Sequence, residues 1–173
     1  MTARIWEMAK NITLNLEGGY QCNPKDRGNW TSGKIGIGEL KGTKYGISAM
    51  SYPDLDIASL TKEQAEYLYK KDYWARCKCD YLPDALSIAV FDYAFNSGVK
   101  RAIKDLQKAL SIKVDGIIGN QTIGACNRLP VKQILDIYLQ NRLDFVISLH
   151  NKTYEKGWVN RIHHIKDICE ELV

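Results

Sequence analysis

No stretch of the 173-residue sequence is long and apolar enough to cross a lipid bilayer. Charges at Arg4, Glu7 and Lys10 interrupt any apolar core of a signal peptide at the N-terminus. Lys and Arg are scattered and the formal net charge is only +4, so no nucleic-acid partner is indicated. Hydrophobic residues make up 45% of the chain, which is not the apolar depletion that marks disorder. The composition therefore predicts one globular unit.

A regular disulfide framework is also missing. The cysteines are five in number and irregularly spaced: Cys22, Cys77, Cys79, Cys126 and Cys169. An odd count without a pattern suits reduced thiols, and we expect the protein to accumulate in the cytoplasm. A metal site would have to combine Cys77 and Cys79 with His163 and His164, but C-x-C lacks the C-x2-C spacing that fits tetrahedral zinc. We therefore expect no metal and no organic cofactor.

Apolar residues at helical spacing predict a mainly α protein. The first helix should run from Ile5 through Leu16 and stop at the glycines 18 and 19, with Glu17 as its last residue or nearly so. Residues 21–52 lose this periodicity, and frequent glycines around pieces such as "KIGIG" indicate a loop with a small β-hairpin. Helix is expected again from Thr61, which forms a capping-box pattern with Gln64.

The segment "ALSIAVFDYAF" is apolar on nearly every face, which predicts a buried central helix. Asp84 is its expected N-cap, and the helix should end at residues 96–98. Asp92 lies inside it, where a structural hydrogen-bonding role is favoured over catalysis. Further amphipathic helices are expected around residues 99–110 and 134–149, separated by the turns "VDGIIG" and Pro130.

The opening stretch "NLEGGYQCNPKDRG" contains two carboxylates that could carry chemistry. A carboxylate at a helix C-terminus faces the negative end of the helix dipole, so Glu17 could retain a proton and donate it to a glycosidic oxygen. Asp26 could stabilise an oxocarbenium-like transition state or position a water. Tyr20 could offer its ring to a sugar, and Thr43 and Tyr45 have hydroxyls able to orient the water. Taken alone, Glu17 would better fit an ordinary exposed helix end followed by a glycine stop.

An ordered set of motifs covers nearly the whole chain: "LEGGY", "NPKDRG", "TKYGIS", "YLYKKDYW", "LPDALSIAVFDYAFNSG", "LQKALSIKVDGIIGNQT" and "GWVNR". Together they closely resemble the glycoside hydrolase 108 family of lysozyme-like N-acetylmuramidases, which includes phage endolysins and secretion activator proteins. The resemblance implies a lysozyme-like catalytic region at residues 1–93 and a predicted peptidoglycan-binding region at 94–173, packed as one unit.

The resemblance also implies roles for particular residues. The family's catalytic glutamate in E-G-G-Y falls on Glu17, its loop aspartate on Asp26, and its T-x-Y-G-I-[ST] motif on residues 43 and 45–48. The chain departs from the family at Cys22-Asn23-Pro24, where the usual acidic residue is lost. The segment from Asn29 to Gly42 also looks longer than usual, which leaves the exact placement of Thr43 and Tyr45 open.

Several residues keep two interpretations. Asn96 and Gly98 in "FNSG" could border the sugar-binding cleft, as the resemblance implies, or cap a helix. Asp115 and Gly116 should make a turn of architectural importance. Trp158, Asn160 and Arg161 could touch glycan, but pinning of the last helix to the core is favoured.

By resemblance, the expected activity is hydrolysis of the β-1,4 bond between N-acetylmuramic acid and N-acetylglucosamine, by a monomer acting on peptidoglycan glycan strands. A holin-like membrane protein is the implied partner for delivery, either in phage lysis or in secretion. Two alternatives stay open: a lytic transglycosylase, and a non-catalytic peptidoglycan-binding or secretion-assisting module.

Overall fold

The computed structural model describes residues 2–14, 16 and 18–173. These residues form seven α-helices, several short 3-10 or π segments and one two-stranded sheet. The predicted mainly helical fold, with a small hairpin after the first helix, is confirmed. None of the helices in the described ranges combines the length and apolar character needed to cross a bilayer. The chain divides into a helical unit, Met1–Ala9 with Asp72–Val173, and a loop unit, Lys10–Lys71.

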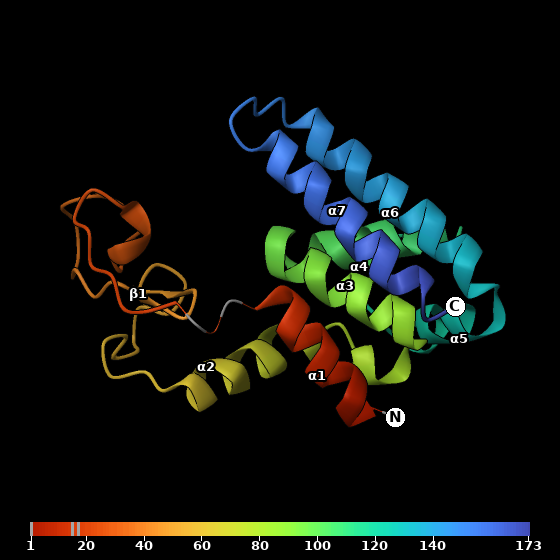
Figure 1. The fold of residues 1–173 in the computed structure, drawn as a ribbon, viewed down its shortest axis with the longest axis horizontal. Coiled ribbons are helices and arrows are strands. Elements are labelled where there is room, and N and C mark those ends of the chain that lie inside the picture. Colours follow the sequence, from red (N-terminus) through yellow and green to blue (C-terminus); the bar gives the residue numbers. More distant parts are fainter. Residues whose placement is uncertain (1, 15, 17) are drawn as a thin grey trace. The chain divides into compact units, whose positions relative to one another are not determined.

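The helical unit is built around α3 (Asp84–Ser97). Ten consecutive residues of α3, from Ala85 to Ala94, are buried, as the all-round apolar pattern predicted. Against it pack α4 (Val99–Ala109), α6 (Val131–Ser148) and α7 (Glu155–Glu170). Figure 1 shows α6 and α7 side by side. Gly98 ends α3 and precedes α4 with a φ of 92°, a backbone angle that favours glycine and allows the chain to turn at once.

Helix α1 (Thr2–Thr13) contributes an aromatic side chain to the same core. Trp6 meets Trp74 and Phe91 edge to face, with ring centres 5.3 and 5.5 Å away. The prediction that this helix continues to Leu16 is wrong, because it ends at Thr13. Asn, Ile and Thr, which fill its last three positions, have weaker helix propensity than Ala or Leu. Leu16 is nevertheless buried, so its apolar spacing reflected burial of the side chain and not another turn of helix.

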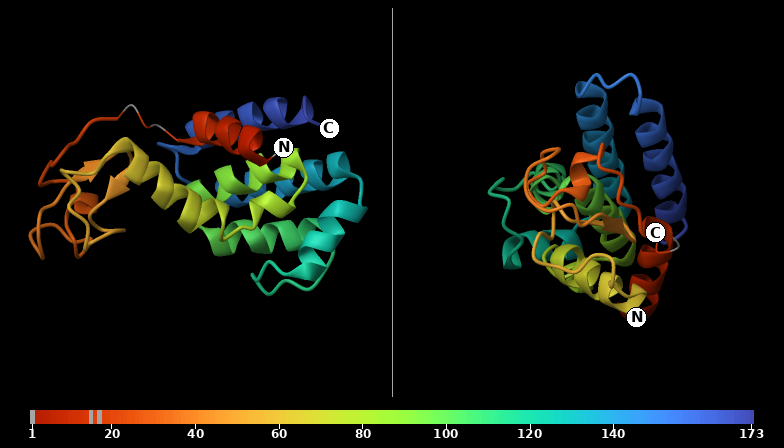
Figure 2. Two further views of the ribbon diagram at one scale, coloured as in Figure 1. Left: turned by 90° about the horizontal axis from the view of Figure 1, so that it is seen from below. Right: turned by 90° about the vertical axis from the view of Figure 1, so that its left-hand side faces the viewer.

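The loop unit contains the hairpin, with β1 (Thr43–Lys44) antiparallel to β2 (Ile47–Ser48). The two connecting residues, Tyr45 and Gly46, have φ of 52° and 79°. A two-residue turn with both φ values positive matches the twist of the strands it joins. Figure 2 shows irregular coil around these short strands. The segment "KIGIG" forms turns, leaving its two isoleucines more than half exposed.

Helix α2 (Lys62–Tyr69) begins at the predicted capping box. The Thr61 hydroxyl accepts from the Gln64 N–H at 3.1 Å, and the Gln64 side chain accepts from the Thr61 N–H at 2.9 Å. The α-helix ends at Tyr69 and widens into a π-helical segment, Lys70–Trp74. Within the loop unit, the Tyr69 hydroxyl donates to the Tyr45 carbonyl at 2.7 Å and so fixes the hairpin turn to α2.

The predicted turn before α5 (Asn120–Arg128) is also confirmed, with Gly116 at a φ of 76°. Buried Gln107 organises this turn. Its Oε1 accepts from the Gly116 N–H at 2.9 Å, and its Nε2 donates to Asp115 at 2.9 Å and to the Ile117 carbonyl at 3.0 Å. One buried amide therefore sets the path of the whole loop.

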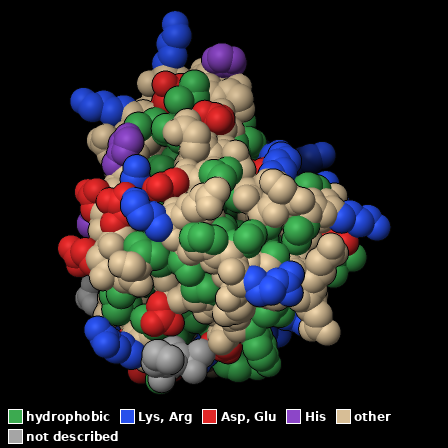
Figure 3. Space-filling view, turned by 90° about the vertical axis from the view of Figure 1, so that its right-hand side faces the viewer, with side chains coloured by type: hydrophobic (Ala, Val, Ile, Leu, Met, Phe, Trp, Pro, Cys, Tyr) green, Lys and Arg blue, Asp and Glu red, His purple; other side chains and the backbone are tan. Residues whose placement is uncertain are grey.

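Surface charges are mixed on the face drawn in Figure 3, where Lys and Arg side chains are separated by acidic, apolar and other polar groups. On α6, Lys132 and Asp136 form an i,i+4 pair with 3.5 Å between Nζ and Oδ2. Both side chains are exposed, so this pair is expected to contribute little to stability.

Candidate functional site

Buried Asn29 connects two of the predicted site residues of the loop unit. The Thr43 hydroxyl donates to Asn29 Oδ1 at 2.7 Å, and Asn29 Nδ2 donates to Gln21 Oε1 at 2.8 Å. Gln21 Nε2 in turn donates to Asp26 Oδ2 at 3.3 Å. We call Gln21, Asp26, Asn29 and Thr43 the amide network. It joins the predicted carboxylate to the predicted hydroxyl through two residues that sequence reasoning missed.

The backbone of Asn23 fixes which way both amides point. Its carbonyl accepts from Asn29 Nδ2 at 3.0 Å, and its N–H donates to Gln21 Oε1 at 3.1 Å. Each amide must therefore present its oxygen and nitrogen as described. Because Asn29 offers an oxygen to Thr43, the Thr43 hydroxyl proton is committed to that bond. The lone pairs of the Thr43 hydroxyl oxygen can then accept from a water or a sugar hydroxyl.

Asp26 lies in an open loop and has a structural partner of its own. It caps the short 3-10 helix η1 (Arg27–Asn29), with Oδ1 accepting from the Gly28 N–H at 2.9 Å. The side chain is exposed to solvent. A carboxylate oxygen can accept more than one hydrogen bond, and both oxygens of Asp26 keep that capacity. A carboxylate in this open position can stabilise positive charge or hold a water.

Tyr20 is 44% exposed, and its hydroxyl donates to the Lys41 carbonyl at 3.1 Å. Directly after it, Gln21 and Thr43 exchange two backbone hydrogen bonds of 3.0 and 2.9 Å. Both contacts require a close approach to Gly42, where an added Cβ would lie 2.5 Å from the Gln21 carbonyl oxygen and from the Tyr20 ring. Gly42 therefore allows the Tyr20 ring and the amide network to lie side by side.

Gly42→Ala is expected to destabilise the protein by about 1–3 kcal/mol more than Gly36→Ala, because the added methyl group overpacks the site. Gly36 is a matched control: its φ of 78° resembles the 86° of Gly42, yet nothing lies within 4 Å of its added Cβ. Chemical denaturation of both variants measures the difference. Equal losses would mean that backbone strain alone explains the glycine at position 42.

Tyr45 has a mainly architectural environment. It occupies the left-handed first position of the hairpin turn, and its carbonyl accepts from Tyr69. The Lys44 ammonium lies 5.4 Å from the centre of its ring. Within the described residues the Tyr45 hydroxyl donates no hydrogen bond, and its water-orienting role stays a prediction.

Asn96 and Gly98 belong to the helical unit. Asn96 is exposed and donates from Nδ2 to the Asp92 carbonyl at 2.8 Å, while Gly98 forms the turn between α3 and α4. Gly98 is therefore the C-cap of α3, while Asn96 lies in the last turn of the helix and bonds within it. Their role in sugar binding stays a prediction.

Asp92 is fully buried and has two arginine partners. Arg142 Nη1 donates to Oδ2 at 2.7 Å, and Arg161 Nε donates to Oδ1 at 3.0 Å. Burial alone would raise the pKa of Asp92, but the two guanidinium groups outweigh it and hold this pKa below its ordinary value. The predicted structural role of Asp92 is confirmed, as is the prediction that Arg161 pins α7 to the core. Arg142 was missed, although a charge on the apolar face of α6 was the available signal.

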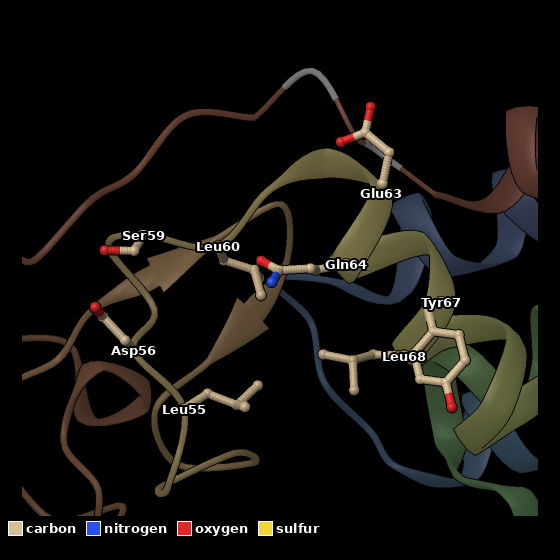
Figure 4. A pocket seen from close by; sticks show the side chains of 8 residues that line it. All are labelled: Leu55, Asp56, Ser59, Leu60, Glu63, Gln64, Tyr67 and Leu68. Carbon is tan, nitrogen blue, oxygen red and sulfur yellow. The ribbon is translucent and has the colours of Figure 1, made fainter.

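A pocket of about 470 Å³ opens in the loop unit, away from the amide network. Figure 4 shows Leu55 and Leu68 pointing toward one another, while the Glu63 carboxylate points away from them. The wall of this pocket is mainly apolar and contains none of the predicted site residues. The lining residues are Leu55, Asp56, Ser59, Leu60, Glu63, Gln64, Tyr67 and Leu68.

The described residues include no group of three or more His, Cys, Asp or Glu side chains that could hold a metal ion. Cys77 and Cys79 are buried, whereas His163 and His164 are exposed. Burial, followed by the neighbouring Cys77, raises the pKa of the Cys79 thiol, which disfavours the thiolate that metals bind. The arrangement gives no support to the metal alternative.

Residues 10–98 match the family model for glycosyl hydrolase 108. The chain belongs to the glycosyl hydrolase 108 family. Residues 101–163 match a second model, described as a predicted peptidoglycan domain. A solved structure of Brucella abortus SagA is 26% identical, with a match covering 99% of this chain and 97% of that one at a TM-score of 0.78. No curated protein sequence matches the chain.

Membership of the glycosyl hydrolase 108 family makes the chain a glycoside hydrolase with a region related to peptidoglycan binding. Glu17 falls within the family match but lies outside the described residues, so its catalytic role stays a prediction. The predicted boundary between residues 93 and 94 also stays a prediction.

Proposed function

We propose that the protein hydrolyses the β-1,4 bond between N-acetylmuramic acid and N-acetylglucosamine in peptidoglycan. One observation carries this proposal: a glycosyl hydrolase 108 region at residues 10–98 is followed within the same chain by a predicted peptidoglycan domain at 101–163. The first region supports cleavage of a glycosidic bond. The second supports peptidoglycan as the polymer, whose glycan strands contain that bond.

In the proposed reaction Glu17 protonates the glycosidic oxygen that leaves. General-acid catalysis of this kind contributes roughly 10²- to 10⁴-fold to the rate. The exposed carboxylate of Asp26 stabilises the positive charge that develops on the sugar ring or holds the attacking water. Thr43 can accept a hydrogen bond from that water, because the hydroxyl proton of Thr43 is already donated to Asn29. Tyr20 offers its half-exposed ring to a sugar.

Asn29 and Gln21 are positioning residues in this scheme. They are not expected to touch the reacting atoms, but they fix the orientation of the Thr43 hydroxyl and one oxygen of Asp26. The backbone of Asn23 in turn fixes both amides, so the arrangement is present before substrate binds. Preorganised polar groups of this kind need no rearrangement during the reaction.

Delivery to the wall is part of the proposal. The protein accumulates as a monomer in the cytoplasm, and a holin-like membrane protein releases it to its substrate in phage-type lysis or secretion. Fractionation of cells that express the chain with and without such a protein tests this step. Appearance of the chain outside the membrane without the partner, and without lysis, would contradict it.

Mass spectrometry of muropeptides released from purified peptidoglycan tests the reaction. Hydrolysis is expected to yield fragments that end in reducing N-acetylmuramic acid, because water is added across the bond. Anhydro ends would instead identify a lytic transglycosylase. Binding to the wall without any released fragment, at several pH values, would favour the non-catalytic module.

A further inference from the structure

Helices α3, α6 and α7 of the helical unit enclose a second pocket of about 210 Å³. This volume is below the roughly 300–1,000 Å³ that is usual for sites enclosing a whole small-molecule ligand. It suits one small group, such as the end of a substituent on a polymer. The lining residues are Asn96, Ser97, Arg142, Phe145, Val146, Leu149, Trp158 and Arg161.

A buried guanidinium group beside this pocket is incompletely hydrogen-bonded. Both charged lining residues are arginines, and each donates to Asp92. The side chain of Arg142 is only 3% exposed, and its buried Nε has no hydrogen-bonding partner within the described ranges. A buried charge that is incompletely paired is unfavourable. An anion entering the pocket would pair with the guanidinium group of Arg142 and reduce this penalty.

The remaining walls decide which anion fits. Phe145, Leu149 and Trp158 provide apolar surface next to the guanidinium groups, and the Trp158 ring stacks on Tyr154 with 5.9 Å between centres. A guanidinium matches the planar geometry of a carboxylate. Apolar walls beside it favour a carboxylate with an apolar substituent over a wholly hydrophilic anion such as phosphate.

We propose that this pocket binds a carboxylate that carries a methyl group on the neighbouring carbon. Peptidoglycan offers this chemistry at the D-alanine end of the peptide stem, and at the lactyl group of N-acetylmuramic acid where the stem, which is otherwise amide-linked to that carboxyl, has been removed. The choice of polymer rests on the proposed function. It is supported by position, because six of the eight lining residues fall within the predicted peptidoglycan domain.

Titration of the full chain, followed by NMR of the Trp158 indole N–H, tests the proposal. The probes are N-acetylmuramic acid and N-acetyl-D-alanyl-D-alanine, with N-acetylglucosamine and inorganic phosphate as probes that lack the methyl-carboxylate group. At least one carboxylate probe is expected to shift the Trp158 signal in a saturable way. If only N-acetylmuramic acid shifts the Trp158 signal, the ligand is the lactyl group. If only N-acetyl-D-alanyl-D-alanine shifts it, the ligand is the end of the peptide stem.

Ser97→Tyr should fill the pocket without replacing Asp92 or either arginine, and it is expected to weaken binding at least tenfold. Gln133→Tyr, on the exposed surface of α6, is the matched control and should leave binding unchanged. Arg142→Lys retains the charge but not the planar geometry, and a folded variant should also bind at least tenfold more weakly. The proposal is overturned if Ser97→Tyr binds normally, if no carboxylate shifts the signal, or if phosphate or N-acetylglucosamine binds equally well.

This test separates the pocket from the proposed function because it does not measure hydrolysis. If the protein releases muropeptides but no probe shifts the Trp158 signal, the proposed function stands and the proposed binding in this pocket fails. If the protein binds the carboxylate probes but does not cleave peptidoglycan, the proposed binding in this pocket stands and the proposed function fails.

Discussion

Replacing Glu17 by glutamine is expected to reduce peptidoglycan hydrolysis by roughly 10²- to 10⁴-fold, the contribution usual for a general acid. Glutamine keeps the size and hydrogen-bonding shape of the side chain but cannot transfer the proton that the leaving oxygen needs. Loss of turbidity of a peptidoglycan suspension measures the rate. Sedimentation with the insoluble polymer should show that the variant still binds.

The control for this experiment is Glu171→Gln, the same substitution at an exposed position after α7. It should hydrolyse peptidoglycan at the rate of the unmodified protein. Full activity of Glu17→Gln would refute the assignment of the general acid. Loss of activity together with a lower unfolding temperature would indicate a structural role for Glu17 and would also contradict the assignment.

Replacing Asp92 by asparagine is expected to destabilise the protein by about 3–5 kcal/mol, the usual effect of removing one partner of a buried ion pair. The variant leaves Arg142, which is 97% buried, without a counter-charge, and it removes the charged contact between α3 and α7. Chemical denaturation measures the loss. Asp136→Asn is the matched control, because its exposed pair with Lys132 is worth about 0–1 kcal/mol.

The same contact predicts a dependence of stability on pH. The pKa of Asp92 is lower in the folded protein than its ordinary value, so the ionised side chain stabilises the fold above the unfolded-state pKa of about 3.9. That contribution should be lost as the pH falls below this value and through the lowered folded-state pKa. Asp92→Asn should show a smaller decrease in stability over this acidic range. An identical decrease in both proteins would assign the acid sensitivity to other carboxylates.

The sequence by itself determined the features that depend on near neighbours in the chain. The burial of α3 follows from its apolar composition on every face, and the start of α2 follows from Thr61 and Gln64, three residues apart. The ordered motifs indicated the family, because many weak local signals in a fixed order are specific together. The predicted end of α1 was wrong, because the buried Leu16 has the same apolar spacing that another helical turn would have.

The tertiary structure decided which polar groups meet. Thr43 reaches Asn29 across 14 residues of sequence, and Asp92 reaches Arg142 and Arg161 across 50 and 69. Such pairs leave no periodic signal, since their meeting depends on how loops close and helices pack and not on spacing along one element. Buried amides and charges nevertheless need hydrogen-bonding partners. In the folded protein buried Asn29 bonds the other members of the amide network, and buried Arg142 bonds the carboxylate of Asp92.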